Sequence, residues 1–220
     1  MNIDYILKVR PIDEKGIGDR SNGSDPKLLV STLAKAKGDY LIQGLLDPKI
    51  VNGNMISSNE EKIDSNGLHE KFDLSFYKEG DECIVLTADQ VVTHANSILE
   101  KPKDIFEAKS FVERYADSPP ATVGAVVLTH LPSMLQVSGV DTATIHFKET
   151  VKGCNLIERL LEDDAPVLDC AGGLMVEHPL VQEHISNIDG TEDSVMGLSK
   201  DLVLSLLQSL KEKLESHNNI

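Results

Sequence analysis

The hydrophobic pattern of the chain centres on residues 83–87, Cys-Ile-Val-Leu-Thr, where apolar or β-branched residues follow one another without alternation. Such a run predicts a strand buried on both faces, since a strand with one wet face alternates apolar and polar residues. Asp89 and Gln90 follow almost at once. A carboxylate where a buried strand emerges is either a turn residue or a functional residue, because α/β proteins gather ligands at such strand ends.

Upstream of this strand, the pattern predicts a strand over residues 3–10 and then a helix. Asp25 and Pro26 are typical of a helix start, with aspartate as the N-cap and proline at the first helical position. We expect the helix to end near Tyr40. Lys37 borders its apolar face, a position that by itself indicates a lysine extending its ammonium group to water. The expected apolar face consists of Leu29, Val30, Leu33 and Ala36.

Residues 44–80 differ in character from the rest of the chain. Polar and charged residues dominate there, and no apolar periodicity survives between residues 52 and 71. We therefore expect a long polar insertion that is flexible, and we assign no role to the histidine within it, His69.

Downstream of the central strand, the pattern predicts a short return strand, a hairpin and several helices. Asp104 and Glu107 form a capping-box pattern that indicates a helix start. Gly172 and Gly173 interrupt a run that has strand composition. The expected segments are a return strand at 98–99, hairpin strands at 121–129 and 136–147, a helix at 150–162, a broken strand at 167–180 and a final helix from Ser199.

Charge and composition exclude several classes of partner. The 220 residues carry a formal net charge of −15, which opposes binding to polymeric nucleic acid or to anionic membranes. No apolar run reaches the roughly 18 residues of a membrane helix, and the first residues lack signal-peptide character, so we expect a cytoplasmic protein. Cys83, Cys154 and Cys170 lie far apart and are expected to be reduced.

Several catalytic motifs are absent from the chain. The histidines form no HxH or HExxH pattern, and there is no GxSxG, GxGxxG or Walker sequence. What remains is a set of carboxylates and lysines, Glu14 and Asp89 with Lys37 and Lys101. Such a set could hold Mg²⁺ on oxygen ligands and phosphates on cations, leaving one carboxylate to activate water. The spacing of these four residues in the sequence is equally compatible with charged side chains on a solvated surface.

Six short motifs occur in the order and approximate spacing of the Maf family of nucleoside triphosphate pyrophosphatases, which the chain resembles over nearly its whole length outside 44–80. They are Ile12-Asp13-Glu14, Leu33-Ala34-x-x-Lys37, Ala88-Asp89-Gln90-Val91-Val92, Lys101-Pro102, Ala171-Gly172 and Val195-Met196-Gly197-Leu198. The resemblance implies one α/β domain over residues 1–220, with an extended mixed sheet and two lobes around a central cleft. It also implies a homodimer, and hydrolysis of a nucleotide to the monophosphate and pyrophosphate with a divalent metal, Mg²⁺ or Mn²⁺.

Carried over by position, the resemblance assigns roles to six residues. Asp89 is expected to be the general base and a metal-linked carboxylate, with Glu14 as a second metal ligand. The residues expected to bind the nucleotide or its phosphates are Lys37, Gln90, Lys101 and Glu177. These roles agree with phosphoryl chemistry, which mainly needs charge neutralisation and an oriented water.

Glu177 also suggests which base is bound. The run Cys170-Ala171-Gly172 followed by Glu177 is similar to the 7-methyl-GTP type of the family. A carboxylate only accepts hydrogen bonds, which suits the N1–H and N2–H₂ donors of guanine better than the mixed edge of uracil or thymine. We therefore expect the substrate to be a methylated guanosine triphosphate. The alternative is that Glu177 is simply a carboxylate at the rim of the site.

The chain departs from the family pattern in one respect. Family members begin with a buried strand and an S-x-S-x-x-R loop that holds the triphosphate, and neither Arg10 nor Arg20 lies in that pattern. We expect either that the sequence begins after this segment or that the protein is a catalytically silent relative that binds a nucleotide or another protein.

Overall fold

The computed structural model describes residues 5–7, 12–46, 77–78, 80–173 and 175–218. The expected polar insertion at 44–80 lies mostly outside these residues, as does most of the expected strand at 3–10. Residues 5–7, which are described, carry no strand.

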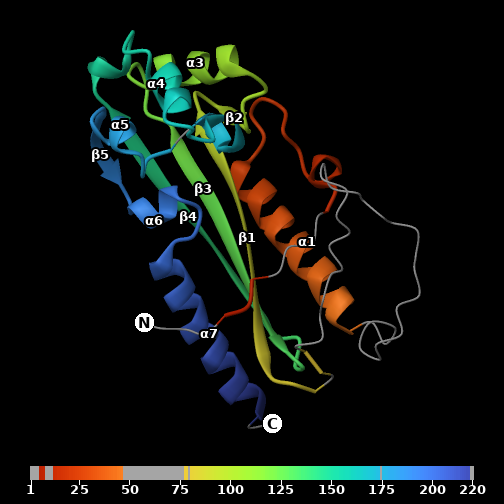
Figure 1. Cartoon of the computed structure of the whole chain (residues 1–220). Coiled ribbons are helices and arrows are strands. Elements are labelled where there is room, and N and C mark those ends of the chain that lie inside the picture. Colours follow the sequence, from red (N-terminus) through yellow and green to blue (C-terminus); the bar gives the residue numbers. More distant parts are fainter. Residues whose placement is uncertain (1–4, 8–11, 47–76, 79, 174, 219–220) are drawn as a thin grey trace.

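The described residues form an α/β fold, which confirms the expected fold class (Figure 1). The strands are β1 (Cys83–His94), β2 (Ser97–Leu99), β3 (Ala121–Leu131), β4 (Gln136–Phe147) and β5 (Ile185–Asp189). The α-helices are α1 (Pro26–Leu46), α3 (Ile105–Arg114), α4 (Leu156–Glu162), α5 (Pro179–Gln182), α6 (Glu192–Val195) and α7 (Lys200–Asn218). Short 3₁₀ turns are η1 (Glu14–Gly16), η2 (Glu149–Val151), η3 (Val167–Asp169) and η4 (Ala171–Gly173).

The five described strands form one sheet in the order β2-β1-β3-β4-β5. Every pairing among them is antiparallel, so the mixed sheet implied by the family resemblance is not seen in this part of the chain. The predicted hairpin is confirmed, because β3 pairs with β4 over residues 121–129 and 136–144. The return strand after β1 is also confirmed, as β2.

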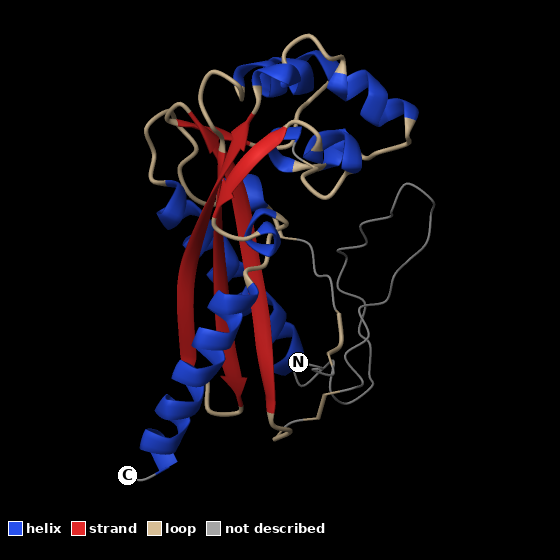
Figure 2. Cartoon of the chain, turned by 90° about the vertical axis from the view of Figure 1, so that its left-hand side faces the viewer, coloured by secondary structure: helices blue, strands red, loops and turns tan. Residues whose placement is uncertain are grey.

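Two long helices cover opposite faces of the sheet, as the two views in Figures 1 and 2 show. Helix α1 packs on β1 and β3, where Leu29 and Leu33 meet Val91 and Val123. Helix α7 packs on β3 and β4, where Leu206 and Leu210 meet Leu128. Burying these apolar side chains is the main force that holds both helices on the sheet.

A separate helical layer lies beyond the end of β1, at the top of Figure 1. Helices α3 and α4 pack there with η3 and η4 around a core that includes Phe111, Tyr115 and Ile157. Asp104 caps α3 by accepting a hydrogen bond from the Glu107 amide at 2.8 Å, as its capping-box pattern predicts.

The prediction that residues 83–87 are buried on both faces is wrong. Val85 is buried against α1, but Ile84 and Leu86 remain 46% and 39% exposed on the opposite face. The reason is the placement of α7, which contacts β3 and β4 rather than this half of β1.

Three other segment predictions need correction. Helix α1 continues past Tyr40 to Leu46, because Ile42 and Leu45 extend its buried face. The helix expected at 150–162 is instead η2 followed by α4, since Gly153 and Asn155 adopt positive φ values between them. The broken strand expected at 167–180 is replaced by η3, η4 and α5.

Candidate active site

The centre of the candidate site is Asp89 on the face of β1 that is covered by α1. Its side chain is only 7% exposed. Thr87, two residues earlier on the same face, donates its hydroxyl hydrogen to the Ala34 carbonyl of α1 at 2.8 Å. An added Cβ at Gly38 would lie 3.0 Å from the Thr87 hydroxyl oxygen, so the missing side chain allows helix and strand to approach closely. This close packing brings α1 within reach of Asp89.

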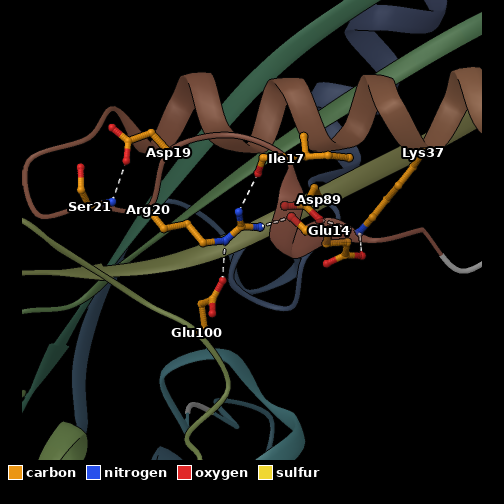
Figure 3. Close-up of polar contacts among 8 residues, drawn as sticks. All are labelled: Glu14, Ile17, Asp19, Arg20, Ser21, Lys37, Asp89 and Glu100. Carbon is orange, nitrogen blue, oxygen red and sulfur yellow. Dashed lines mark hydrogen bonds and ion pairs between the residues drawn. The ribbon is translucent and has the colours of Figure 1, made fainter.

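Lys37 bridges two carboxylates from distant parts of the chain, as Figure 3 shows. Its ammonium nitrogen lies 2.6 Å from Asp89 Oδ1 and 2.9 Å from Glu14 Oε1. Glu14 comes from η1, in the loop before α1. The structure therefore brings together Glu14, Lys37 and Asp89, three of the residues that the sequence singled out.

The electrostatics of this cluster depend on burial and on the lysine. Burial raises the pKa of Asp89, and hydrogen bonding and attraction from Lys37 partly oppose that rise. Burial alone lowers the pKa of Lys37, but its contacts with Asp89 and Glu14 reverse the effect and raise the pKa overall. The cluster thus combines a firmly protonated lysine with a carboxylate that is more basic than usual.

Arg20 belongs to this neighbourhood and was missed at the sequence level. Its guanidinium group donates to the carbonyls of Glu14 and Ile17 at 2.8 and 2.6 Å, and its Nε lies 2.6 Å from Glu100 Oε1. Its charge also lowers the pKa of Asp89. The available signal was weak: an isolated arginine in a glycine-rich loop, whose partners are mainly backbone carbonyls.

Gln90 does not join the cluster around Asp89. Successive residues of a strand face opposite sides of the sheet, so Gln90 points toward α6. There its side-chain amide donates to the Val195 carbonyl at 2.9 Å, while its Oε1 is buried without a recorded partner. An added Cβ at Gly197 would lie 3.0 Å from this oxygen.

Lys101 and Glu177 lie in a second group, near the helical layer. Both are exposed. Burial is the main cause that raises the pKa of the Cys170 thiol. The negative charge of Glu177 raises this pKa further, and the positive charge of Lys101 lowers it, so both charges act on the same thiol. No hydrogen bond or ion pair of either side chain is recorded among the described residues, and neither contacts Asp89 there.

The carboxylates of Glu14 and Asp89 could supply some, but not all, of the ligands of a divalent metal ion. Among the described residues, no group of three or more His, Cys, Asp or Glu side chains is placed to hold a metal ion. Glu14 and Asp89 offer two carboxylates on either side of one ammonium group. Mg²⁺ is commonly bound by one or two carboxylates, with water and substrate phosphate oxygens completing the shell, so these donors suit it.

A cavity of about 390 Å³ lies away from the Asp89 cluster. It is bounded by α1 and the β3–β4 hairpin, and its lining includes Lys35, Asp39 and Gln136. The catalytic interpretation therefore depends on the contacts of Asp89 and not on the size of a cavity.

In the part of the chain that the structure describes, no helix is long and apolar enough to cross a membrane.

Comparison with known proteins gives one family and two named relatives. The family model described as "Maf-like protein" matches residues 1–210. The chain is 27% identical over 214 residues to a protein of Dictyostelium discoideum named 7-methyl-GTP pyrophosphatase, covering 96% of this chain and 90% of the relative. It is 29% identical over 134 residues to a protein of Salinibacter ruber (strain DSM 13855 / M31) named dTTP/UTP pyrophosphatase, covering 60% of this chain and 64% of that relative.

Proposed function

Because the chain belongs to the Maf-like family, we propose that it is a nucleotide pyrophosphatase that hydrolyses a nucleoside triphosphate to the monophosphate and pyrophosphate. Both relatives are named pyrophosphatases of nucleoside triphosphates, although their bases differ. The observation that carries the proposal is the partly buried contact between Lys37 and Asp89.

Asp89 acts as the general base in the proposed reaction. It removes a proton from a water molecule whose oxygen bonds to the α-phosphorus. The bond from the α-phosphorus to the α–β bridging oxygen breaks, and pyrophosphate leaves with the bonding electrons. The raised pKa of Asp89 suits this role, because a more basic carboxylate accepts the proton more readily.

The two lysines neutralise phosphate charge. The ammonium group of Lys37 has three N–H donors, and its two carboxylate contacts leave a third for a phosphate oxygen. Lys101 supplies a second cation at the side of Glu177. Local cations of this kind are needed because the net charge of −15 repels a triphosphate at long range.

A divalent metal, Mg²⁺ or Mn²⁺, completes the proposed site. Glu14 and Asp89 would hold it with their carboxylate oxygens, which both lie beside the Lys37 ammonium group. When bound, the metal supplies positive charge to the phosphate oxygens.

Glu177 is proposed to recognise the base, with 7-methyl-GTP as the preferred substrate. Its carboxylate would accept hydrogen bonds from the N1–H and N2–H₂ groups of the purine. The name of the Dictyostelium relative agrees with this choice, while the name of the Salinibacter relative gives the alternative of a pyrimidine nucleotide.

The activity is tested by measuring pyrophosphate and orthophosphate release separately, with Mg²⁺ and each nucleoside triphosphate. We expect the wild-type chain to release pyrophosphate and Asp89→Asn to lose at least about 100-fold in kcat, the lower range for a general base. Asp39→Asn is the matched control, because Asp39 is an exposed carboxylate on α1 that pairs with Lys35 outside the site. This variant should keep wild-type activity.

Other outcomes identify a different function. Nucleotide binding without pyrophosphate release by the wild-type chain would favour the catalytically silent relative, and orthophosphate release would indicate a phosphatase.

The base assignment has its own test. Glu177→Gln should lower kcat/KM for 7-methyl-GTP about 10-fold or more relative to UTP and dTTP, because an amide no longer presents only acceptors. Glu183→Gln, which changes an exposed glutamate at the end of α5, is the control. Wild-type turnover of UTP or dTTP above that of 7-methyl-GTP would contradict the proposed substrate.

A further inference from the structure

Arg20 holds the loop that presents Glu14. Two of its N–H groups donate to the carbonyls of Glu14 and Ile17, at 2.8 and 2.6 Å. These carbonyls lie at the beginning of η1 and just after it, so one planar guanidinium group spans the short turn (Figure 3). The turn has no buried residue of its own, so it is held by the Arg20 guanidinium group, by the ion pair of Glu14 with Lys37 and by the packing of Ile17 against α1.

The same guanidinium group ties this loop to the end of β2. Its Nε lies 2.6 Å from a carboxylate oxygen of Glu100, the residue that follows β2 and precedes Lys101. The backbone carbonyl of Glu100 accepts a hydrogen bond from the Gly172 amide at 2.9 Å. Glu100 therefore uses its side chain to hold the Glu14 loop and its backbone to hold η4.

Gly172 is fixed on its other side as well. Its carbonyl accepts a hydrogen bond from the buried Tyr115 hydroxyl at 2.6 Å. The segment from Gly172 to Glu177 follows directly, and Glu177 shares the surroundings of Cys170 with Lys101. Hydrogen bonds thus link the Glu14 loop, through Arg20 and Glu100, to Gly172.

We propose that Arg20, through Glu100, is a positioning residue that holds the Glu14 side of the proposed catalytic cluster in a fixed position relative to Gly172, the glycine that lies five residues before Glu177 in the sequence. This inference rests on the proposed function for the roles of Glu14 and Glu177. Misplacing a catalytic group by about 1 Å costs on the order of 100-fold in rate, so such a link has a measurable effect on turnover.

Arg20 acts through its neighbours and does not bind the triphosphate. Three of its five N–H groups already have acceptors, and the carboxylate of Glu100 offsets its charge. Its fixed fork matches two carbonyls and one carboxylate at once, which a lysine cannot do.

The test compares Arg20→Gln, Arg20→Lys and Glu100→Gln in steady-state kinetics. Arg20→Gln should lower kcat about 10- to 100-fold with KM changed less than about 3-fold. Arg20→Lys should not restore kcat, because a single ammonium group does not reproduce the planar fork of the guanidinium group. Glu100→Gln should lower kcat by a smaller factor, since its amide oxygen still accepts from Arg20.

The control is Arg114→Gln, which changes an arginine of α3 that bonds within its own helix. It should leave the kinetics unchanged. A rise in KM with unchanged kcat in Arg20→Gln would show that Arg20 contacts substrate and would overturn the proposal. Full recovery of kcat in Arg20→Lys would overturn it too, because charge alone would then suffice.

Amide hydrogen exchange tests the link without turnover. Arg20→Gln should speed exchange in residues 12–18 and, through Glu100, at Gly172, whose amide bonds to the Glu100 carbonyl. Unchanged exchange at both places overturns the inference whether or not the wild-type chain is active. Absence of pyrophosphate release by the wild-type chain would instead contradict the proposed function.

Discussion

At the scale of single residues, Lys37 has the most consequential position in the molecule. The same ammonium group neutralises Asp89 and Glu14, which come from segments more than 70 residues apart in the chain. Without the lysine, the two carboxylates would face each other in a partly buried site, where the negative charge of Glu14 raises the pKa of Asp89.

Lys37→Met should therefore change the pH dependence as well as the rate. In the proposed mechanism Asp89 works when ionised, so we expect activity above the pKa of Asp89 and a loss of activity as pH falls through it. Removing Lys37 removes the two largest contributions that lower this pKa, so the acid limb of kcat/KM should move to higher pH. We also expect kcat to fall about 100- to 1,000-fold.

The control for this variant is Lys35→Met, two residues earlier in α1. Lys35 is exposed and pairs only with Asp39 among the described residues. An acid limb that stays in place in Lys37→Met would contradict the assignment of Asp89 as the base.

In the helical layer, the local packing depends on a single residue, Gly172. Its φ of +64° is one that other residues adopt only with strain, and an added Cβ would lie 2.8 Å from Tyr115 Oη and 2.9 Å from Val92 Cγ1. Gly172→Ala should lower the free energy of unfolding by about 2–4 kcal/mol, measured by urea denaturation.

Gly153→Ala separates the two causes of this loss. Gly153 has a similar φ of +67°, but nothing lies within 4 Å of an added Cβ. It should lose only about 1 kcal/mol, the cost of the backbone conformation. Equal losses in the two variants would mean that crowding at Gly172 is unimportant.

At the scale of elements, α1 and α7 have different tasks. Helix α1 carries Lys37 and packs closely on the strand that carries Asp89, so its placement sets the geometry of the proposed catalytic cluster. Helix α7 lies on the opposite face, where it buries Leu206 and Leu210 against β3 and β4. We therefore expect α7 to contribute stability and not catalysis.

Leu210→Ala tests that division. Leu210 is 1% exposed, and truncation of a buried leucine costs about 2–5 kcal/mol. The free energy of unfolding should fall by this amount, while kcat at a temperature where the variant stays folded should remain within about 2-fold. Leu204→Ala on the same helix is the control, because Leu204 is 45% exposed and its truncation should cost little. A large loss of kcat in folded Leu210→Ala would contradict the division.

At the scale of the whole molecule, the strong negative charge selects among phosphate-bearing ligands. A net charge of −15 opposes polymeric nucleic acid, whose binding depends on many cations, but it permits a small anion held by a few local groups.

This selection predicts that RNA and DNA oligonucleotides do not bind. Fluorescence anisotropy at about 50 mM salt, where electrostatic attraction is strongest, should show no binding, and the oligonucleotides should not inhibit pyrophosphate release. A nucleoside triphosphate should compete with substrate under the same conditions. Oligonucleotide binding that weakens steeply with salt would mean that a local basic surface overrides the net charge.

The local pattern of the sequence was sufficient for much of the fold. The hairpin at β3 and β4, the caps of α1 and α3 and the apolar face of α7 were all predicted, because each depends on residues close together in the chain. The placement of Gln90 away from Asp89 was also available from strand alternation, but motif resemblance grouped the two together.

Only the tertiary structure decided the contacts between distant segments. The exposure of Ile84 and Leu86 depends on where α7 settles, and the role of Arg20 depends on carbonyls that every residue possesses and no sequence pattern marks. The sequence by itself determined which side chains are available to the proposed phosphoryl chemistry, Asp89 and Lys37 above all. Packing of α1 on β1 decided that these two meet, because a 2.6 Å contact across 52 residues depends on how whole elements pack.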